Sequence, residues 1–227
     1  MGRGRVKPTQ TETAMPTLYY SRNQNPRLAV AVARYLDAPV TLEWASPFHP
    51  DHAERFRRLN PAQRIPILVE DGVPLWEADA IACRLSQLVG SDFWRQGAGQ
   101  PDMIRWISWG KESFVRACDI VSCETGTKPR YQIGPQDAEA IAEGHPQFHQ
   151  AAPILDRHLA GRDWLGGATP FYADFRMATF LPSNAAMRLP LADYPALNAW
   201  HDRLNALPAW ADPFGGLDAS DLPPIPA

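Results

Sequence analysis

The segment from Asn60 to Leu85, NPAQRIPILVEDGVPLWEADAIACRL, constrains the fold more than any other part of the chain. Pro66 precedes a short apolar run, and a proline suits the first residue or the edge of a strand because it cannot donate to a sheet ladder. The turn signal at residues 70–72 separates two β-prone runs and predicts a hairpin. Acidic residues from Glu77 onward then begin an amphipathic helix.

The sequence before this segment predicts a strand, a helix, a strand and a short helix. Residues 17–20 are β-prone, and Pro26 suits the first turn of a helix that ends near residues 37–39. Residues 40–44 alternate as a strand does, and residues 51–59 form an Arg-rich helix. The complete order is β-α-β-α-β-β-α, and the right-handed crossover rule makes the first two strands parallel.

This order resembles the thioredoxin-like N-terminal domain of glutathione transferases. The family motif of Asn-Pro, a basic residue, Val/Ile-Pro, a hairpin and Glu-Ser stands here as Asn60-Pro61, Arg64, Ile65-Pro66 and Glu77-Ala78. The resemblance implies a cis peptide bond before Pro66, beside which the peptide backbone of glutathione pairs. Ala78 departs from the pattern, since the family usually has Ser or Thr there.

The second half of the chain is predicted to be helical. Residues 97–101 break the pattern, and apolar residues at helical spacing follow in the runs 103–123, 135–159 (broken or kinked near residues 144–146), 173–187 and 193–207. We therefore expect a thioredoxin-like domain over residues 17–92, a linker over 93–100 and an all-helical domain over 101–217. Residues 1–16 are expected to form a disordered tail and residues 218–227 an extended one.

Two local patterns in this half also resemble the family's helical domain. Residues 170–174 resemble a helix-start box, in which a hydroxyl and a carboxylate three residues apart satisfy free N–H groups. Here Asp174 supplies the carboxylate but Phe171 replaces the hydroxyl residue, so half of the box is missing. Tyr194, Pro195 and Trp200 match the family's late Tyr-Pro-x-Leu-x-x-Trp helix.

Composition excludes several other classes of protein. The chain has 227 residues and a formal net charge of -3, so no broad basic surface is available for nucleic acid or anionic lipid. Its apolar runs are too short for a membrane span, and residues 1–16 lack the apolar region of a signal peptide. Cys83, Cys118 and Cys123 have no CxxC spacing, which indicates a reducing, cytoplasmic location. No metal-binding spacing is present.

The resemblance implies a hydrogen-bond donor to the glutathione thiolate, between Tyr20 and Arg27. A tyrosine-type enzyme would use Tyr20, whereas an alignment on Arg27 reaches Asn23. Bacterial relatives with an asparagine in this turn align with Asn25, which we favour ahead of Asn23 and Tyr20. Ser21 lies close to the strand and stays an alternative. Both asparagines also suit a loop or a helix cap without any catalytic role.

The resemblance also implies a set of glutathione-binding residues: Gln63, Arg64, Ile65, Pro66, Glu77 and Ala78. Ile65 would offer its backbone, and Arg64 would pair with a carboxylate. Glu77 and the N–H of Ala78 would hold the γ-glutamyl end at a helix N-terminus. The alternative for Arg64 is a solvated loop residue.

The electrophile pocket is expected between the domains, beside the first long helix after the linker. Candidate lining residues are Trp106, Trp109, Phe114 and Arg116. An aromatic stripe at this spacing is more often core than pocket, and that alternative stays open.

These features favour a glutathione transferase-like enzyme. It would activate glutathione, its co-substrate, for attack on a small hydrophobic electrophile, as in detoxification, or for a related thiol reaction. The resemblance implies a homodimer, and no metal, nucleic acid or membrane is expected as a partner. The alternative is a non-catalytic binding or assembly module with the same fold, which Ala78 and Phe171 favour.

Overall fold

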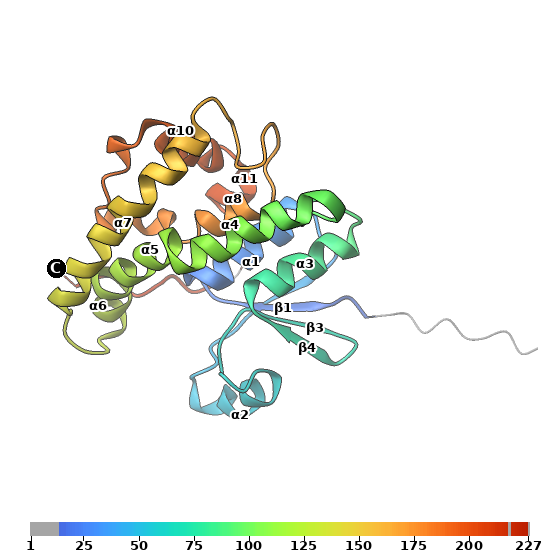
Figure 1. Cartoon of the computed structure of the whole chain (residues 1–227). Coiled ribbons are helices and arrows are strands. Elements are labelled where there is room, and N and C mark those ends of the chain that lie inside the picture. The colour runs from blue at the N-terminus through green and yellow to red at the C-terminus, as the bar shows by residue number, and fades with distance from the viewer. Residues whose placement is uncertain (1–13, 218, 227) are drawn as a thin grey trace, which may run out of the picture.

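The computed structural model describes residues 14–217 and 219–226, and most of the predicted N-terminal tail lies outside them. A four-stranded mixed sheet forms the first domain (Figure 1). Its strands are β1 (Thr17–Tyr20), β2 (Thr41–Trp44), β3 (Ile67–Glu70) and β4 (Val73–Trp76), in the spatial order β2-β1-β3-β4. Strand β1 is parallel to β2 and antiparallel to β3, which is also antiparallel to β4. The predicted order of elements and the parallel first pair are confirmed.

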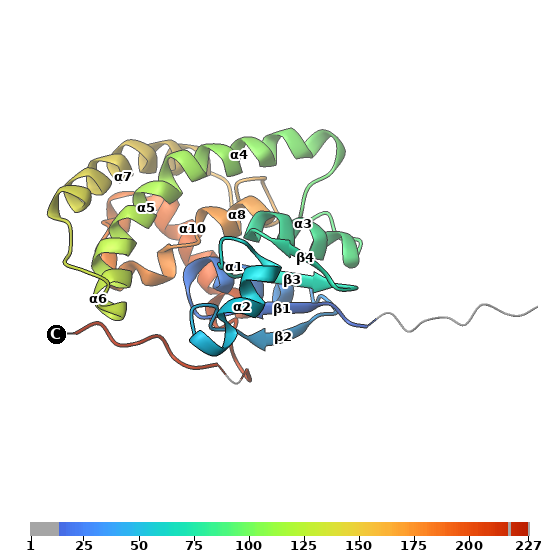
Figure 2. The ribbon, with the colours of Figure 1, turned by 90° about the horizontal axis from the view of Figure 1, so that it is seen from below.

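Three helices cover the two faces of this sheet (Figure 2). Helices α1 (Gln24–Tyr35) and α3 (Ala78–Leu88) pack on one face, and α2 (Pro50–Leu59) lies on the other. The alternation of side chains along β1 matches this arrangement, because Leu18 joins the large core while Tyr19 packs edge-on against Phe56 of α2.

The second domain is all-helical. Its α-helices are α4 (Gln100–Glu112), α5 (Phe114–Ser122), α6 (Lys128–Tyr131), α7 (Ala138–Leu159), α8 (Tyr172–Met177), α9 (Asn184–Met187), α10 (Pro195–Asn205) and α11 (Pro208–Ala211). A π-helical turn, Cys123–Thr127, joins α5 to α6, and 3-10 turns lie at Gly97–Gly99, Leu181–Ser183 and Leu191–Asp193. Every residue of α8 is buried, so this short helix belongs to the core of the helical domain.

Helix boundaries differ from the predicted runs in three places. The run 103–123 divides at Ser113, whose backbone leaves the helical region at φ -130 and ψ -92. The run 173–187 divides into α8, a 3-10 turn and α9. The run 135–159 was predicted to be broken or kinked near residues 144–146, and it is not broken, because α7 continues through Pro146 and Pro153.

Packing against α5 explains the continuity of α7. Gly144 lies so close to α5 that a Cβ there would meet Cγ2 of Val121 at 2.7 Å. Phe148 of α7 is fully buried and packs on the ring of Phe114. This contact offsets the roughly 3 kcal/mol that a proline costs inside a helix.

The segment between the domains is packed rather than free. Phe93 is 4% exposed and its ring lies 5.0 Å from that of Tyr35 and 5.1 Å from that of Phe175. Its carbonyl accepts a hydrogen bond from the backbone N–H of Tyr172, at the start of α8. The two domains therefore share one continuous core.

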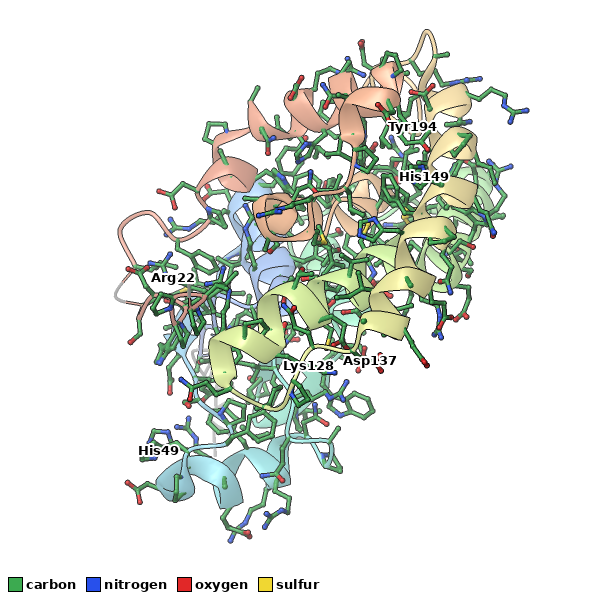
Figure 3. The ribbon with its side chains drawn as sticks, turned by 90° about the vertical axis from the view of Figure 1, so that its left-hand side faces the viewer. Arg22, His49, Lys128, Asp137, His149 and Tyr194 are labelled. Atoms are coloured by element: carbon green, nitrogen blue, oxygen red, sulfur yellow. The ribbon has the colours of Figure 1, made fainter. Side chains whose placement is uncertain are left out.

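The C-terminal segment runs in an extended conformation past the start of α1 and reaches α6 (Figures 2 and 3). Arg22 Nη2 donates to the carbonyl of Ala219 across 3.2 Å, and Arg22 Nε lies 3.3 Å from a carboxylate oxygen of Asp221. Arg130 donates to the carbonyl of Pro223 across 2.8 Å. Two arginines, one from each domain, thus hold this segment. Over the described part of the chain, no helix is long and apolar enough to cross a membrane.

Candidate active site

The register of the sheet brings two strand–helix junctions to Pro66. Tyr19 of β1 pairs with Ile67 of β3, and Ile67 also pairs with Trp76 of β4. Extending both registers by one residue brings Tyr20, the last residue of β1, and Glu77 opposite Pro66. The Ile65–Pro66 peptide bond is cis.

A buried asparagine shapes the loop that leads into this bond. Asn60 is 2% exposed, accepts a hydrogen bond from the N–H of Ala62 and donates one to the carbonyl of Arg64. Gln63 takes a positive φ of 51° and donates to the carbonyl of Ala53, so its side chain points toward α2. The Arg64 side chain is exposed. The sequence motif contained Asn60, but its bracing role depends on a tertiary contact that no pattern indicated.

Ile65 offers the backbone groups that the resemblance requires. Within the described residues, neither its N–H nor its C=O has a hydrogen-bond partner. Its side chain is half-buried against the cluster of Tyr19 and Phe56. An extended peptide lying alongside would therefore find an unpaired donor and acceptor next to the cis-proline, a mode of strand addition common in peptide recognition.

The start of α3 lies beside this backbone and carries local strain. Glu77 has φ 75 and ψ 126, a conformation that L-residues rarely adopt, and its side chain is exposed. Strained backbone of this kind costs about 1–3 kcal/mol and is concentrated at functional sites. Ala78 is 5% exposed, and no side chain caps the first N–H groups of α3. This helix end suits a carboxylate, as the resemblance implies.

At the start of α1 the two asparagines differ in how their amides are engaged. Asn23 uses both ends of its amide, since Oδ1 accepts from the Tyr131 hydroxyl at 3.1 Å and Nδ2 donates to Ser21 Oγ at 3.3 Å. Asn25 is exposed, and its Oδ1 accepts from Arg176 Nη1 at 2.8 Å. Among the residues that the structure describes, no acceptor lies within hydrogen-bond distance of Asn25 Nδ2. The geometry therefore favours Asn25 over Asn23 as a donor to a ligand.

The two other candidates at this junction are buried. Tyr20 is 1% exposed, and its ring stacks on Phe214 and packs edge-on against Trp44. Ser21 is 6% exposed, and its Oγ accepts from Asn23.

Sequence reasoning missed a cluster of charges between the two junctions. Arg176 of α8 is 8% exposed, and its Nε lies 3.3 Å from Oδ1 of Asp79 in the first turn of α3. The same oxygen accepts from the Tyr172 hydroxyl, and Lys111 Nζ lies 3.2 Å from the other oxygen. The sequence signal that could have predicted this cluster was Arg176, a charged residue inside the apolar run of α8.

Two of the residues predicted to line an electrophile pocket belong to the core of the helical domain instead. Phe114 is fully buried against Phe148 of α7. Trp106 is 6% exposed, and its ring lies 4.5 Å from that of His158, also of α7. Both prediction and alternative were consistent with the helical spacing, and the structure supports the core alternative for these two residues.

The other two candidates are more accessible. Trp109 is half-buried and packs edge-on against Trp106, while Arg116 is exposed on α5. Asp119, one turn further along α5, marks the side of that helix nearest the first domain. Desolvation raises the pKa of Asp119, and the charges of Arg176, Arg64 and Arg116 act to lower it. Arginines of both domains therefore lie close enough to act on this carboxylate, although Asp119 itself is exposed.

The three cysteines lie on helix α3, on helix α5 and at the start of the π-helical turn. Burial raises the pKa of all three thiols, most strongly that of the fully buried Cys118. None of the three forms a disulfide, and none lies in the β1–α1 loop. The raised pKa values make the protein's own thiols weak nucleophiles.

Comparison with protein families identifies both halves of the chain. Residues 27–88 match the model described as "Glutathione S-transferase, N-terminal domain", and residues 116–208 match "Glutathione S-transferase, C-terminal domain". The sequence is 30% identical over 206 residues to the glutathione S-transferase stcT of Emericella nidulans, covering 86% of this chain and 90% of that protein.

Two further relatives show how widely this architecture is shared. The disulfide-bond oxidoreductase YfcG of Escherichia coli is 25% identical over 68% of this chain and 73% of its own length. The crystal structure of a theta class glutathione S-transferase from Xanthomonas axonopodis pv. citri, solved with glutathione bound, superimposes with a TM-score of 0.75. It is 22% identical and covers 90% of this chain and 98% of its own, which demonstrates the shared fold.

Proposed function

Since this chain belongs to the glutathione S-transferase family, we propose that it binds glutathione along the cis-proline and activates its thiol. This proposal is supported by the cis Ile65–Pro66 bond and by three elements whose polar groups have no hydrogen-bond partner among the described residues. These are the backbone of Ile65, the start of α3 at Ala78 and the start of α1 with the free Nδ2 of Asn25.

The proposed binding mode assigns each end of the tripeptide to one element. The cysteinyl backbone pairs with the N–H and C=O of Ile65. The γ-glutamyl ammonium meets the carboxylate of Glu77, and its carboxylate accepts from the first N–H groups of α3. The glycyl carboxylate lies within reach of the exposed Arg64.

In this mode the sulfur faces the start of α1, where two effects favour the thiolate. The helix N-terminus carries a partial positive charge, and Asn25 Nδ2 donates a hydrogen bond. Each unit of pKa lowering needs about 1.4 kcal/mol of preferential thiolate stabilisation. One hydrogen bond to a charged acceptor supplies about 1.5–3 kcal/mol, so these groups suffice for a shift of one to two units.

The proposed reaction is nucleophilic attack by this thiolate. With an aryl halide, a C–S bond forms at the ring carbon and the halide leaves with the electron pair of the broken carbon–halogen bond. Trp109 and Arg116 are the pocket candidates that this proposal retains.

The similarity to a disulfide-bond oxidoreductase favours a second candidate, glutathione-dependent disulfide exchange. The thiolate would attack a disulfide, giving a mixed disulfide and releasing one thiolate. A second glutathione would then resolve the mixed disulfide, because burial raises the pKa of Cys83, Cys118 and Cys123 and disfavours their thiolates.

We also propose that the protein acts as a homodimer in the cytoplasm. Large apolar side chains are exposed on both domains, notably Phe48 at 74% and Val73 at 67% on the first and Ile104 at 46% on the second. Val73 lies on β4, an edge strand of the sheet. Burial of these side chains against a second copy supports the proposal, and sedimentation at several concentrations tests it.

Titration of bound glutathione tests the proposed function. Calorimetry should detect binding, and the ultraviolet absorbance of the thiolate should give a pKa below that of free glutathione. Asn25→Ala should raise this pKa by about one unit with little change in affinity, because one donor is lost. Asn23→Ala is the matched control and should leave it unchanged.

Turnover then separates the candidate reactions. Conjugation of a generic aryl halide supports transfer, and glutathione-dependent reduction of a small disulfide supports exchange. A wild-type protein that neither binds glutathione nor catalyses either reaction would contradict the proposal and favour an assembly module.

A further inference from the structure

Arg176 is the one contact that the helical domain makes with the Asn25 amide in the described residues. The two residues lie 151 positions apart, on α8 and in the first turn of α1, with 2.8 Å between Nη1 and Oδ1. Arg176 is buried at 8% exposure although Asn25 itself is exposed. The guanidinium therefore approaches the amide from within the protein.

The chemistry of arginine determines which way this amide faces. A guanidinium has only N–H donors, so the atom that faces it must be the amide oxygen. Asn25 Nδ2 consequently faces away from Arg176, and no acceptor within the described part of the chain occupies it. A contact to lysine would fix the same oxygen less rigidly, because an ammonium group lacks the planar fork of a guanidinium.

Asp79 holds the guanidinium in this position. Its Oδ1 lies 3.3 Å from Arg176 Nε and accepts from the Tyr172 hydroxyl, while Lys111 Nζ lies 3.2 Å from its Oδ2. Asp119 of α5 is close enough to interact with the Arg176 charge. Arg176 thus joins the starts of α1 and α3, the two helices that flank the cis-proline.

From these contacts we propose that Arg176 is a positioning residue for the thiolate donor. It orients the Asn25 amide so that Nδ2 faces the glutathione sulfur, and it adds a positive charge behind that amide. Asp79 in turn fixes Arg176. This inference rests on the proposed function, because it gives the proposed donor its orientation.

Arg176→Lys and Arg176→Met test the two contributions separately. Lysine keeps the charge but loses the fork, whereas methionine loses both. We expect the pKa of bound glutathione to rise by about half a unit in Arg176→Lys and by about one unit in Arg176→Met. Below the pKa, the second change lowers the thiolate fraction about tenfold. Glutathione affinity by calorimetry should change less than about threefold, since Arg176 does not contact the ligand.

Arg27→Lys is the matched control for a purely structural effect. Arg27 also lies on α1 and contacts the helical domain, donating to the carbonyl of Trp210 with its guanidinium 4.8 Å from that ring. Among the described residues, no hydrogen bond joins the Arg27 side chain to Asn25. Arg27→Lys and the Arg176 substitutions should all lower the melting temperature, but only the Arg176 substitutions should change the thiol pKa.

A double-mutant cycle completes the test. If Arg176 acts through the amide, Arg176→Lys should have no further effect on the thiol pKa once Asn25 is alanine. Asp79→Asn should reproduce part of the Arg176→Lys shift and serves if the arginine variants do not fold. One outcome would overturn this inference alone: the wild-type protein binds glutathione and Asn25→Ala raises the thiol pKa, but no variant at Arg176 or Asp79 changes it. A wild-type protein that binds no glutathione would overturn the proposed function and this inference together.

Discussion

Asn60 donates a hydrogen bond from Nδ2 to the main-chain carbonyl of Arg64 across 2.8 Å, from a side chain that is 2% exposed. Its Oδ1 accepts from the N–H of Ala62 at 3.0 Å. One amide therefore spans the loop that ends at the cis-proline and holds the backbone that precedes Ile65.

Asn60→Ala should weaken both the fold and glutathione binding. The backbone groups of Ala62 and Arg64 lose their partner, and each lost hydrogen bond costs about 0.5–1.5 kcal/mol of unfolding free energy. Loosening of the Ile65 backbone should lower affinity by about tenfold, measured by calorimetry alongside urea unfolding. Asn60→Asp keeps the acceptor for Ala62 but places a carboxylate against the Arg64 carbonyl. Its stability and its glutathione affinity should therefore be no higher than those of Asn60→Ala. An alanine variant with wild-type affinity would show that the loop is held by other contacts.

Replacing Glu77 by glycine should increase stability and weaken glutathione binding. Its φ of 75° is strained for an L-residue but not for glycine, so Glu77→Gly should raise the unfolding free energy by about 1 kcal/mol. The same change removes the carboxylate proposed to hold the ammonium of glutathione, and affinity should fall at least tenfold. Glu77→Gln keeps the strain and removes only the charge, so it should lose affinity without gaining stability. Unchanged affinity in Glu77→Gln would remove this residue from the binding site.

The first domain was predictable because its signals are local. Pro66 and the turn at residues 70–72 specify where the third strand begins and how it reverses, whatever packs around them. The family resemblance that the same residues carry implied the candidate backbone site at Ile65. The sequence also predicted half of a helix-start box at Asp174. Its carboxylate accepts a hydrogen bond from the N–H of Phe171, whereas the Phe171 side chain has no acceptor for the reciprocal hydrogen bond.

The side of the site formed by the helical domain was not predictable in this way. Helical spacing shows that Trp106 and Phe114 lie on an apolar face, but not which neighbour that face meets, and it meets α7. The contact between Arg176 and Asn25 depends on how the two domains pack, which no local pattern encodes. Proline signals failed in α7 for the same reason, because packing outweighed a local preference.

Restoring the missing hydroxyl at residue 78 should strengthen glutathione binding. Ala78→Ser adds a donor at the start of α3, beside the carboxylate of the γ-glutamyl end in the proposed mode. One hydrogen bond to a charged group is worth about 1.5–3 kcal/mol, so affinity should rise about tenfold or more by calorimetry. Ala80→Ser, in the same helical turn, is the matched control and should change affinity little. No gain in Ala78→Ser would mean that the ligand carboxylate lies elsewhere.

Asp174 should make stability fall as the pH rises from about 4 to 6. Its carboxylate is fully buried and accepts from the N–H groups of Leu165 and Phe171 and from Trp200 Nε1. Burial raises its pKa to about 6, and these hydrogen bonds lower it only in part. The unfolded chain releases this proton near pH 3.9, so between the two values the folded state alone is protonated.

The sign of the effect follows from that difference in bound protons. Because the folded state binds more protons in this window, the free energy of unfolding falls with rising pH, by up to about 3 kcal/mol over two units. Asp174→Asn has a similar volume and does not titrate, so the wild-type advantage over this variant in urea unfolding should shrink between pH 4 and 6 and then level off. An advantage that grows over the same range would show that the three hydrogen bonds outweigh burial and hold the pKa below its unfolded value.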